Sequence, residues 1–170
     1  IQKTDLKAVL ALSTVSQLGL IMWLFGLATP EAAQAGTFHL LNHSTFKALL
    51  FMVVGIVDHQ TGTREIPLLS GLRRAMPVSA ALAMVGAASM AGVPLLNGFL
   101  SKEMFLTAVN NSSMGLAGAV VATGASLFTT LYCLMLGHKI WFGEPGETPD
   151  EPKEGSRTIL VPPLILAVII

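Results

Sequence analysis

The sequence has few charged residues and little that marks a soluble enzyme. Asp, Glu, Lys and Arg make up 12% of its 170 residues, about half of the fraction usual in a globular domain. Ten basic and ten acidic side chains leave no net charge, so no bulk electrostatic attraction to nucleic acid is expected. The single cysteine, Cys133, cannot form an internal disulfide and is expected to pack as a small apolar side chain.

Motifs for several kinds of chemistry are also missing. The chain contains no glycine-rich phosphate loop, no paired-cysteine motif and no nucleophile elbow. His39 and His43 have a spacing that suits zinc, but the segment supplies no acidic third ligand. We therefore expect no metal, no cofactor, no enzymatic reaction catalysed by this chain and no nucleic-acid partner.

Long apolar runs are what the sequence does contain. Residues 9–28, 78–101 and 110–137 carry no charge, and each run reaches the roughly 20 residues that cross a hydrocarbon core. Residues 36–57 form a fourth run that contains three ionisable side chains, and a fifth run begins at residue 159. These runs predict an all-α, polytopic membrane helix bundle with about four complete spans and the start of a fifth.

The basic residues predict how the bundle is oriented. With helices near 8–28, 36–58, 78–109, 114–142 and from 159 onward, the connections alternate between two sides. Eight of the ten Lys and Arg fall on one side or its helix ends, and the opposite side has none. Those eight are Lys3, Lys7, Arg64, Arg73, Arg74, Lys139, Lys153 and Arg157. The positive-inside rule then places loops 59–77 and 143–158 in the cytoplasm, with the chain in the inner (plasma) membrane.

The same pattern divides the chain into three parts. Residues 1–142 form a transmembrane domain, residues 143–158 a cytoplasmic loop, and residues 159–170 the start of a further helix. The first residue is not Met, and no signal-peptide pattern follows it. We expect an internal piece of a longer protein.

Ionisable side chains inside the second span point to proton movement. His39, His43 and Lys47 lie at i, i+4 and i+8, which places them on one helix face. Histidine both accepts and donates a proton near neutral pH, and burial makes a lysine release its proton more readily. Ionisable groups at membrane depth are costly and usually face a bundle interior or a wet path. The stripe therefore predicts a proton relay, although neighbouring helices that satisfy these groups would explain it too.

The third span is expected to be broken. Pro94 lies between Gly92 and Gly98 in an otherwise continuous run, and proline disrupts the preceding helical turn. Discontinuous helices mark ion sites in transporters. Lys102 follows the break, so it either belongs to such a site or caps a kinked helix and snorkels to water.

Other polar groups have weaker signals. The stripe Ser13, Thr14, Ser16 and Gln17 in the first span is more typical of helix packing than of ion movement. Lys7, Asp58 and His59 lie at the predicted cytoplasmic surface, where they are either solvated or part of a cytoplasmic-side proton pathway.

Three segments carry a family resemblance. DLKAVLALSTVSQLG (5–19), HLLNHSTFKALLF (39–51) and GVPLLNGFLSKE (92–103) resemble the proton-translocating antiporter-like subunits. This superfamily is shared by respiratory complex I, membrane-bound hydrogenases and Mrp-type cation/proton antiporters. GIVDHQTGTRE (55–65) and NGFLSKEMF (97–105) look like the large subunit of the Mrp type.

The resemblance implies a subunit of about fourteen helices with two inverted five-helix repeats, of which this chain holds the later part of the second. It also implies that His39, His43, Lys47 and Lys102 belong to a central hydrophilic axis. The expected partners are other antiporter-complex membrane subunits, the lipid bilayer, protons and Na⁺.

Three functions remain open from the sequence. The first is a subunit of a multisubunit Na⁺/H⁺ antiporter. The second is a proton-pumping subunit of an NADH-quinone oxidoreductase or membrane-bound hydrogenase complex. The third is a structural membrane subunit with vestigial polar groups, and the cost of burying Lys47 and Lys102 argues against it.

Overall fold

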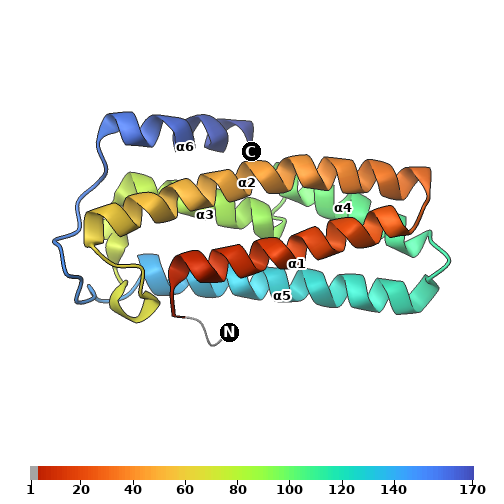
Figure 1. Cartoon of the computed structure of the whole chain (residues 1–170), viewed down its shortest axis with the longest axis horizontal. Coiled ribbons are helices and arrows are strands. Elements are labelled where there is room, and N and C mark those ends of the chain that lie inside the picture. Colours follow the sequence, from red (N-terminus) through yellow and green to blue (C-terminus); the bar gives the residue numbers. More distant parts are fainter. Residues whose placement is uncertain (1–3) are drawn as a thin grey trace.

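The computed structural model describes residues 4–170, which form six α-helices running side by side along one long axis (Figure 1). Lys3, one of the basic residues used to predict the topology, lies outside the described residues. Between residues 4 and 170 the backbone forms no β-strand, and an isolated bridge joins Asp5 to Glu65. The helices are α1 (Leu6–Gly26), α2 (Pro30–Thr61), α3 (Pro77–Ala91), α4 (Asn97–Asn110), α5 (Gly115–Trp141) and α6 (Arg157–Ile169). Two short 3₁₀ turns, η1 (Ile66–Leu68) and η2 (Leu72–Arg74), connect α2 to α3.

Local signals explain where the first two helices begin and end. The Asp5 carboxylate accepts a 2.7 Å hydrogen bond from the Ala8 amide and caps α1. Thr29 caps α2 in the same way, with Pro30 at the first helical position. Gly62, with φ 68°, ends α2 in the left-handed region. The prediction that the second helix begins at residue 36 was therefore wrong, because the Thr29 cap starts it six residues earlier.

The predicted break in the third span is confirmed. α3 ends at Ala91 and α4 begins at Asn97. Gly92 leaves α3 with φ 81°, and Leu95 also has a positive φ, 78°. The break is shorter than expected at one end, because Gly98 lies inside α4 rather than at its boundary.

The helices fit a membrane bundle, but the count of spans differs slightly from the prediction. α1, α2 and α5 are each long and apolar enough to cross a bilayer. α3 and α4 have 15 and 14 residues, so they supply a fourth crossing only together. α6 has 13 residues and runs alongside α2 (Figure 1).

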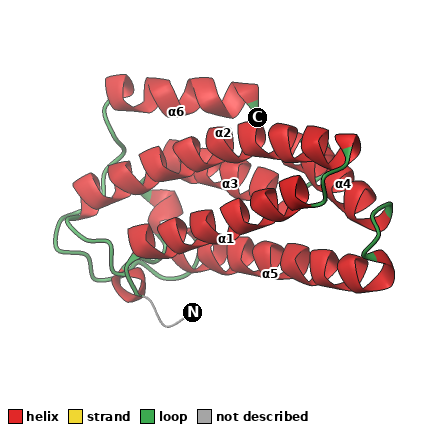
Figure 2. Ribbon diagram, turned by 45° about the vertical axis from the view of Figure 1, so that its right-hand side comes forward, coloured by secondary structure: helices red, strands yellow, loops and turns green. Residues whose placement is uncertain are grey.

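The connections gather at the two ends of the bundle (Figure 2). The amide of Gly146 donates to the Ser70 carbonyl at 3.1 Å, and the amide of Asp150 donates to the Thr61 carbonyl at 3.2 Å. Loops 59–77 and 143–158 therefore share one end, as predicted. The α1–α2 and α4–α5 turns lie at the other end.

Two apolar clusters form the core, and polar side chains separate them. The larger cluster includes Leu10, Phe46 and Met90, and the smaller one includes Leu24 and Phe105. Along each helix, the buried polar residues lie between members of these two clusters. α2 is central to this arrangement, because it packs against α1, α3, α4 and α6.

Candidate functional site

The predicted stripe of ionisable residues lies in the interior of the bundle. His39, His43 and Lys47 point inward from α2, with 7%, 4% and 4% of their surface exposed. The ring centroids of His39 and His43 are 6.3 Å apart. The helical periodicity of the sequence thus placed all three correctly on a buried face.

His39 is held from both sides by neutral side chains. Its Nε2 lies 3.0 Å from the Gln17 Oε1 on α1, and its Nδ1 contacts the Ser101 hydroxyl on α4. The Gln17 amide nitrogen donates to the Thr129 hydroxyl on α5 at 3.0 Å. Because an amide oxygen can only accept, this arrangement assigns the ring hydrogen to Nε2 and makes Nδ1 the acceptor for Ser101. Three helices therefore fix the orientation of one imidazole.

His43 has a different environment. Its ring packs edge-on against Phe46, with centroids 5.5 Å apart. Its Nε2 is buried and has no hydrogen-bond partner among residues 4–170. A buried ring nitrogen without a partner is costly, and such groups occur mainly where a structure exchanges protons or water.

Lys47 is bound by oxygen atoms that carry no charge. Its ammonium donates to the Leu10 carbonyl at 3.2 Å and to the Ser13 hydroxyl. Ser13 in turn lies 3.3 Å from the Tyr132 hydroxyl on α5. Within the described part of the chain, no carboxylate forms an ion pair with Lys47.

Lys102 reaches back across the helix break. Its ammonium donates to the Ala91 carbonyl at 2.7 Å and lies 3.4 Å from the Thr130 hydroxyl on α5. A Cβ on Gly92 would come within 2.6 Å of the Lys102 side chain. Gly92 is therefore required twice, for its left-handed backbone and for the room that Lys102 occupies.

The two halves of the site meet at a small cavity. His39 and Lys102 both line it, together with Gln17, Ser126 and Thr129. Its volume is about 10 Å³, close to the space that one water molecule needs. The structure thus brings Lys102 next to the α2 stripe, which the sequence spacing alone did not specify.

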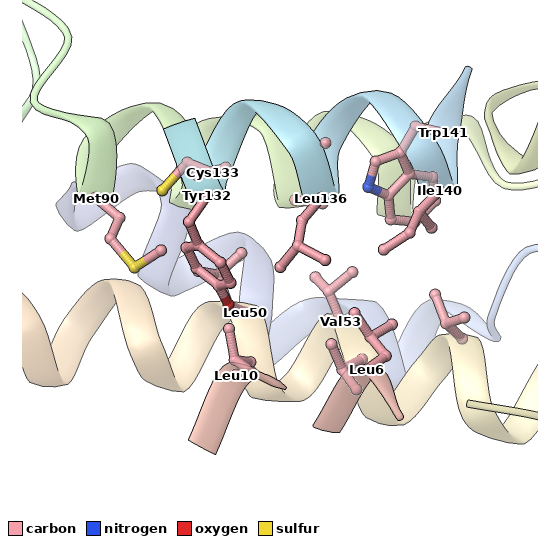
Figure 3. Close-up of a pocket in the computed structure, with 15 residues that line it drawn as sticks. Leu6, Leu10, Leu50, Val53, Met90, Tyr132, Cys133, Leu136, Ile140 and Trp141 are labelled. Carbon is pink, nitrogen blue, oxygen red and sulfur yellow. The ribbon is translucent and has the colours of Figure 1, made fainter. Parts of the chain in front are cut away.

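The three candidates for a cytoplasmic-side pathway lie elsewhere. Lys7 and His59 are exposed, and Asp58 lies 3.9 Å from Arg64. An apolar cavity of about 50 Å³ occupies the interior between their level and Lys47 (Figure 3). Leucine, valine, alanine and methionine side chains supply most of its walls, with Tyr132, Cys133 and Trp141. No hydrogen bond among the described residues joins Lys7, Asp58 or His59 to Lys47.

Several residues of the site have no distinctive signal in the sequence. The sequence pattern favours a helix-packing role for Gln17 and Ser13, and it predicts no functional role for Ser101, Thr129 and Tyr132. Each is a neutral polar side chain on an apolar helix, a signal shared with residues that only join helices. In the range that the structure describes, no group of three or more His, Cys, Asp or Glu side chains is arranged to hold a metal.

Comparison with known proteins places this site in a family. The family model described as "NADH:quinone oxidoreductase/Mrp antiporter, TM" matches residues 1–129. A probable K⁺/H⁺ antiporter subunit of Rhizobium meliloti is 49% identical over 98% of this chain and 17% of its own length. A Na⁺/H⁺ antiporter subunit of Alkalihalophilus pseudofirmus is 43% identical over the whole chain and 24% of its own length. The chain thus spans about a quarter or less of the length of these curated relatives.

A solved structure agrees in fold. The Mrp complex from Dietzia sp. DQ12-45-1b contains a chain that superposes with a TM-score of 0.89 at 27% identity, covering 99% of this chain and 39% of that one. The resemblance carried by the three sequence motifs is confirmed: the chain belongs to the NADH:quinone oxidoreductase/Mrp antiporter transmembrane family.

Proposed function

We propose that this chain is part of a proton-conducting membrane subunit of a multisubunit Na⁺/H⁺ antiporter. The names of the relatives at 43% and 49% identity support antiport, one naming Na⁺ and the other K⁺ as the cation. The proposal places the chain in the plasma membrane among other subunits of the complex, with loops 59–77 and 143–158 on the cytoplasmic side. The basic residues of those loops support this orientation.

One observation carries the proposal: Lys47 is buried at membrane depth and is held only by neutral oxygen atoms. A lysine that is paired with a carboxylate is held in its charged form by that partner. Lys47 has no such partner in the described residues, so proton release leaves no stranded anion behind. A group of this kind responds strongly to charge nearby, at about 2 kcal/mol for a unit charge 8 Å away with an effective dielectric near 20.

The remaining residues extend Lys47 into a path. His43 and His39 follow it along α2 at intervals of one helical turn, and His39 shares a cavity with Lys102. Protons would pass along Lys47, His43 and His39 to Lys102 at the broken helix. The neutral hydrogen-bond partners Ser13, Gln17 and Ser101 keep these groups oriented without trapping charge.

A second function belongs to the same family. The family description names NADH:quinone oxidoreductase beside the Mrp antiporter, and a redox-driven pump would use the same interior groups. In that case proton movement would depend on electron transfer in neighbouring subunits rather than on a cation gradient.

The test uses the complete complex in everted membrane vesicles. Proton movement is followed with a pH-sensitive dye after addition of Na⁺ or K⁺, without any electron donor during the measurement. We expect cation-dependent proton movement in the wild type and its loss in Lys47→Ala and Lys102→Ala. Lys153→Ala, which alters an exposed lysine of loop 143–158, is the matched control. Normal exchange in either buried-lysine variant, with assembly verified, would remove that residue from the path.

A further inference from the structure

A cluster of basic side chains surrounds one aromatic ring at the end of α5. The guanidinium carbon of Arg73, in η2, lies 4.8 Å from the centre of the Phe142 ring. The His138 ring stacks on the same ring, with centroids 6.1 Å apart and planes inclined by 21°. Phe142 therefore holds together groups from two segments that are distant in the sequence. With their neighbours Arg74 and Lys139, these residues form what we call the basic cluster.

The basic cluster is exposed and is not neutralised by the protein. Its four basic side chains lie on the surface, and in residues 4–170 the ion pairs involve Arg64 and Lys153 instead. Glu144 lies nearby, with its backbone against Gly71, but it forms no ion pair with the cluster. The negative end of the α5 dipole accounts for His138 and Lys139. It does not account for Arg73 and Arg74, which belong to a different segment.

An apolar stripe on α5 leads up to the basic cluster. Leu127, Leu131, Leu134 and Met135 are each more than half exposed, and their spacing places them on the same helix face as His138. From Leu127 to His138 the helix rises about 16 Å. That length matches one leaflet, which is half of a hydrocarbon core about 30 Å thick. Both views of the fold place α5 at an edge of the bundle (Figures 1 and 2).

We propose that the basic cluster and the apolar stripe bind one anionic phospholipid. Its phosphate lies against Arg73 and Lys139, where a guanidinium offers paired donors to phosphate oxygens, and an acyl chain lies along Leu134 and Leu131. A zwitterionic lipid fits less well, because its choline cation would approach the same uncompensated charges. Basic pockets at helix ends on the cytoplasmic side of membrane proteins recognise anionic headgroups in this way.

The site is independent of the proton path. It lies at the end of the bundle that carries loops 59–77 and 143–158, and it shares no residue with the path through Lys47 and Lys102. Failure of the proposed antiport would therefore leave this proposal standing, and the reverse also holds. The competing occupant of the stripe is another transmembrane helix of the complex, which the test separates from a lipid.

The experiment titrates the detergent-purified, delipidated complex with phosphatidylglycerol or phosphatidylcholine and counts bound lipids by native mass spectrometry. The main variant is Arg73→Gln with Lys139→Gln. One control, Arg73→Lys with Lys139→Arg, keeps both charges. A second control, Lys153→Gln with Arg157→Gln, removes two charges from the same end of the bundle but outside the basic cluster.

We expect the wild type and both controls to retain phosphatidylglycerol in preference to phosphatidylcholine. The main variant should bind phosphatidylglycerol about twentyfold more weakly, since each basic residue near an anionic surface contributes about fivefold. Equal binding by the main variant and the wild type would overturn the proposal, as would equal weakening in the second control. Displacement of the lipid by millimolar inorganic phosphate would identify a soluble-anion site instead. Crosslinking of Leu131→Cys to another subunit would identify a helix as the occupant of the stripe and overturn it as well.

Discussion

The ammonium of Lys102 donates a 2.7 Å hydrogen bond to the carbonyl oxygen of Ala91, the last residue of α3. In a continuous helix that carbonyl would accept a bond from the amide four residues later. The break frees it, and a free carbonyl at a helix end carries part of the negative pole of the helix dipole. The interruption and the lysine are therefore one unit, because the broken helix supplies the acceptor that makes a buried ammonium tolerable.

Gly92→Ala tests this unit. The new Cβ would meet the Lys102 side chain at 2.6 Å on a backbone with φ 81°, at a combined cost of about 2–4 kcal/mol. We expect the complex to assemble and cation/proton exchange in vesicles to fall at least about tenfold. Gly124→Ala is the control, because nothing lies within 4 Å of its added Cβ. Exchange at the wild-type rate in Gly92→Ala would show that Lys102 does not need its present position.

Gly98→Ala is expected to loosen the contact between α3 and α4. Its Cβ would overlap the Ser89 carbonyl, which is backbone and cannot turn aside. The substitution should destabilise the subunit by about 1–3 kcal/mol or more, measured as a lower thermal unfolding midpoint in detergent. An unchanged midpoint would mean that the two half-helices are not packed as closely as the structure has them.

Lys47→Arg should be as inactive as Lys47→Ala. Arginine keeps the positive charge but does not release its proton under physiological conditions, and its larger head must fit between the Leu10 carbonyl and Ser13. Exchange in vesicles is the measurement, with assembly verified by immunoblot. Substantial exchange in Lys47→Arg would show that Lys47 contributes charge alone rather than a transferable proton.

Glu154→Ala should fray the beginning of α3. The carboxylate accepts from the amides of Val78 and Ser79, at 2.7 and 3.3 Å, and from the Ser79 hydroxyl at 2.5 Å. Loss of such a cap costs about 1–2 kcal/mol, so hydrogen exchange at the first amides of α3 should speed up. Glu151→Ala removes only an exposed ion pair with Lys153 and should leave those amides unchanged. Equal exchange in the two variants would contradict the cap.

Cysteine labelling checks the topology. In a Cys133→Ala background, Ser70→Cys and Thr148→Cys should react from one side of the membrane, and Ser112→Cys from the other. The reason is that loops 59–77 and 143–158 are joined by backbone hydrogen bonds, whereas Ser112 lies in the turn at the opposite end. Labelling of Ser70→Cys and Ser112→Cys from the same side would contradict both the helix count and the orientation.

The sequence predicted the helices and the break because their signals are local. Runs of about 20 apolar residues, a proline between glycines and ionisable groups at helical spacing each have one main physical meaning. The start of α2 was placed too late, because Pro30 and Glu31 resemble a loop when the Thr29 cap is not considered. Local chemistry was present there and was given too little weight.

The partners of the ionisable residues were not predictable in the same way. Gln17 and Ser101 contact His39 only because α1 and α4 are rotated to face α2. Helix rotation depends on packing against several neighbours at once, and it leaves no periodic signal in a single sequence. For the same reason, the sequence did not indicate that His39 and Lys102 line one cavity.

The apolar cavity in Figure 3 has a consequence for energy conservation. Along α2 it occupies the stretch between Lys47 and Asp58, a rise of about 16 Å, and its walls include Val53, Val54 and Val57. A cavity lined by such side chains stays dry, so no chain of water connects the interior lysine to the loops by this route. The valines therefore act as electrical insulation: a charge on Lys47 has no short circuit to that surface, and a gradient across the bundle is not dissipated through its core.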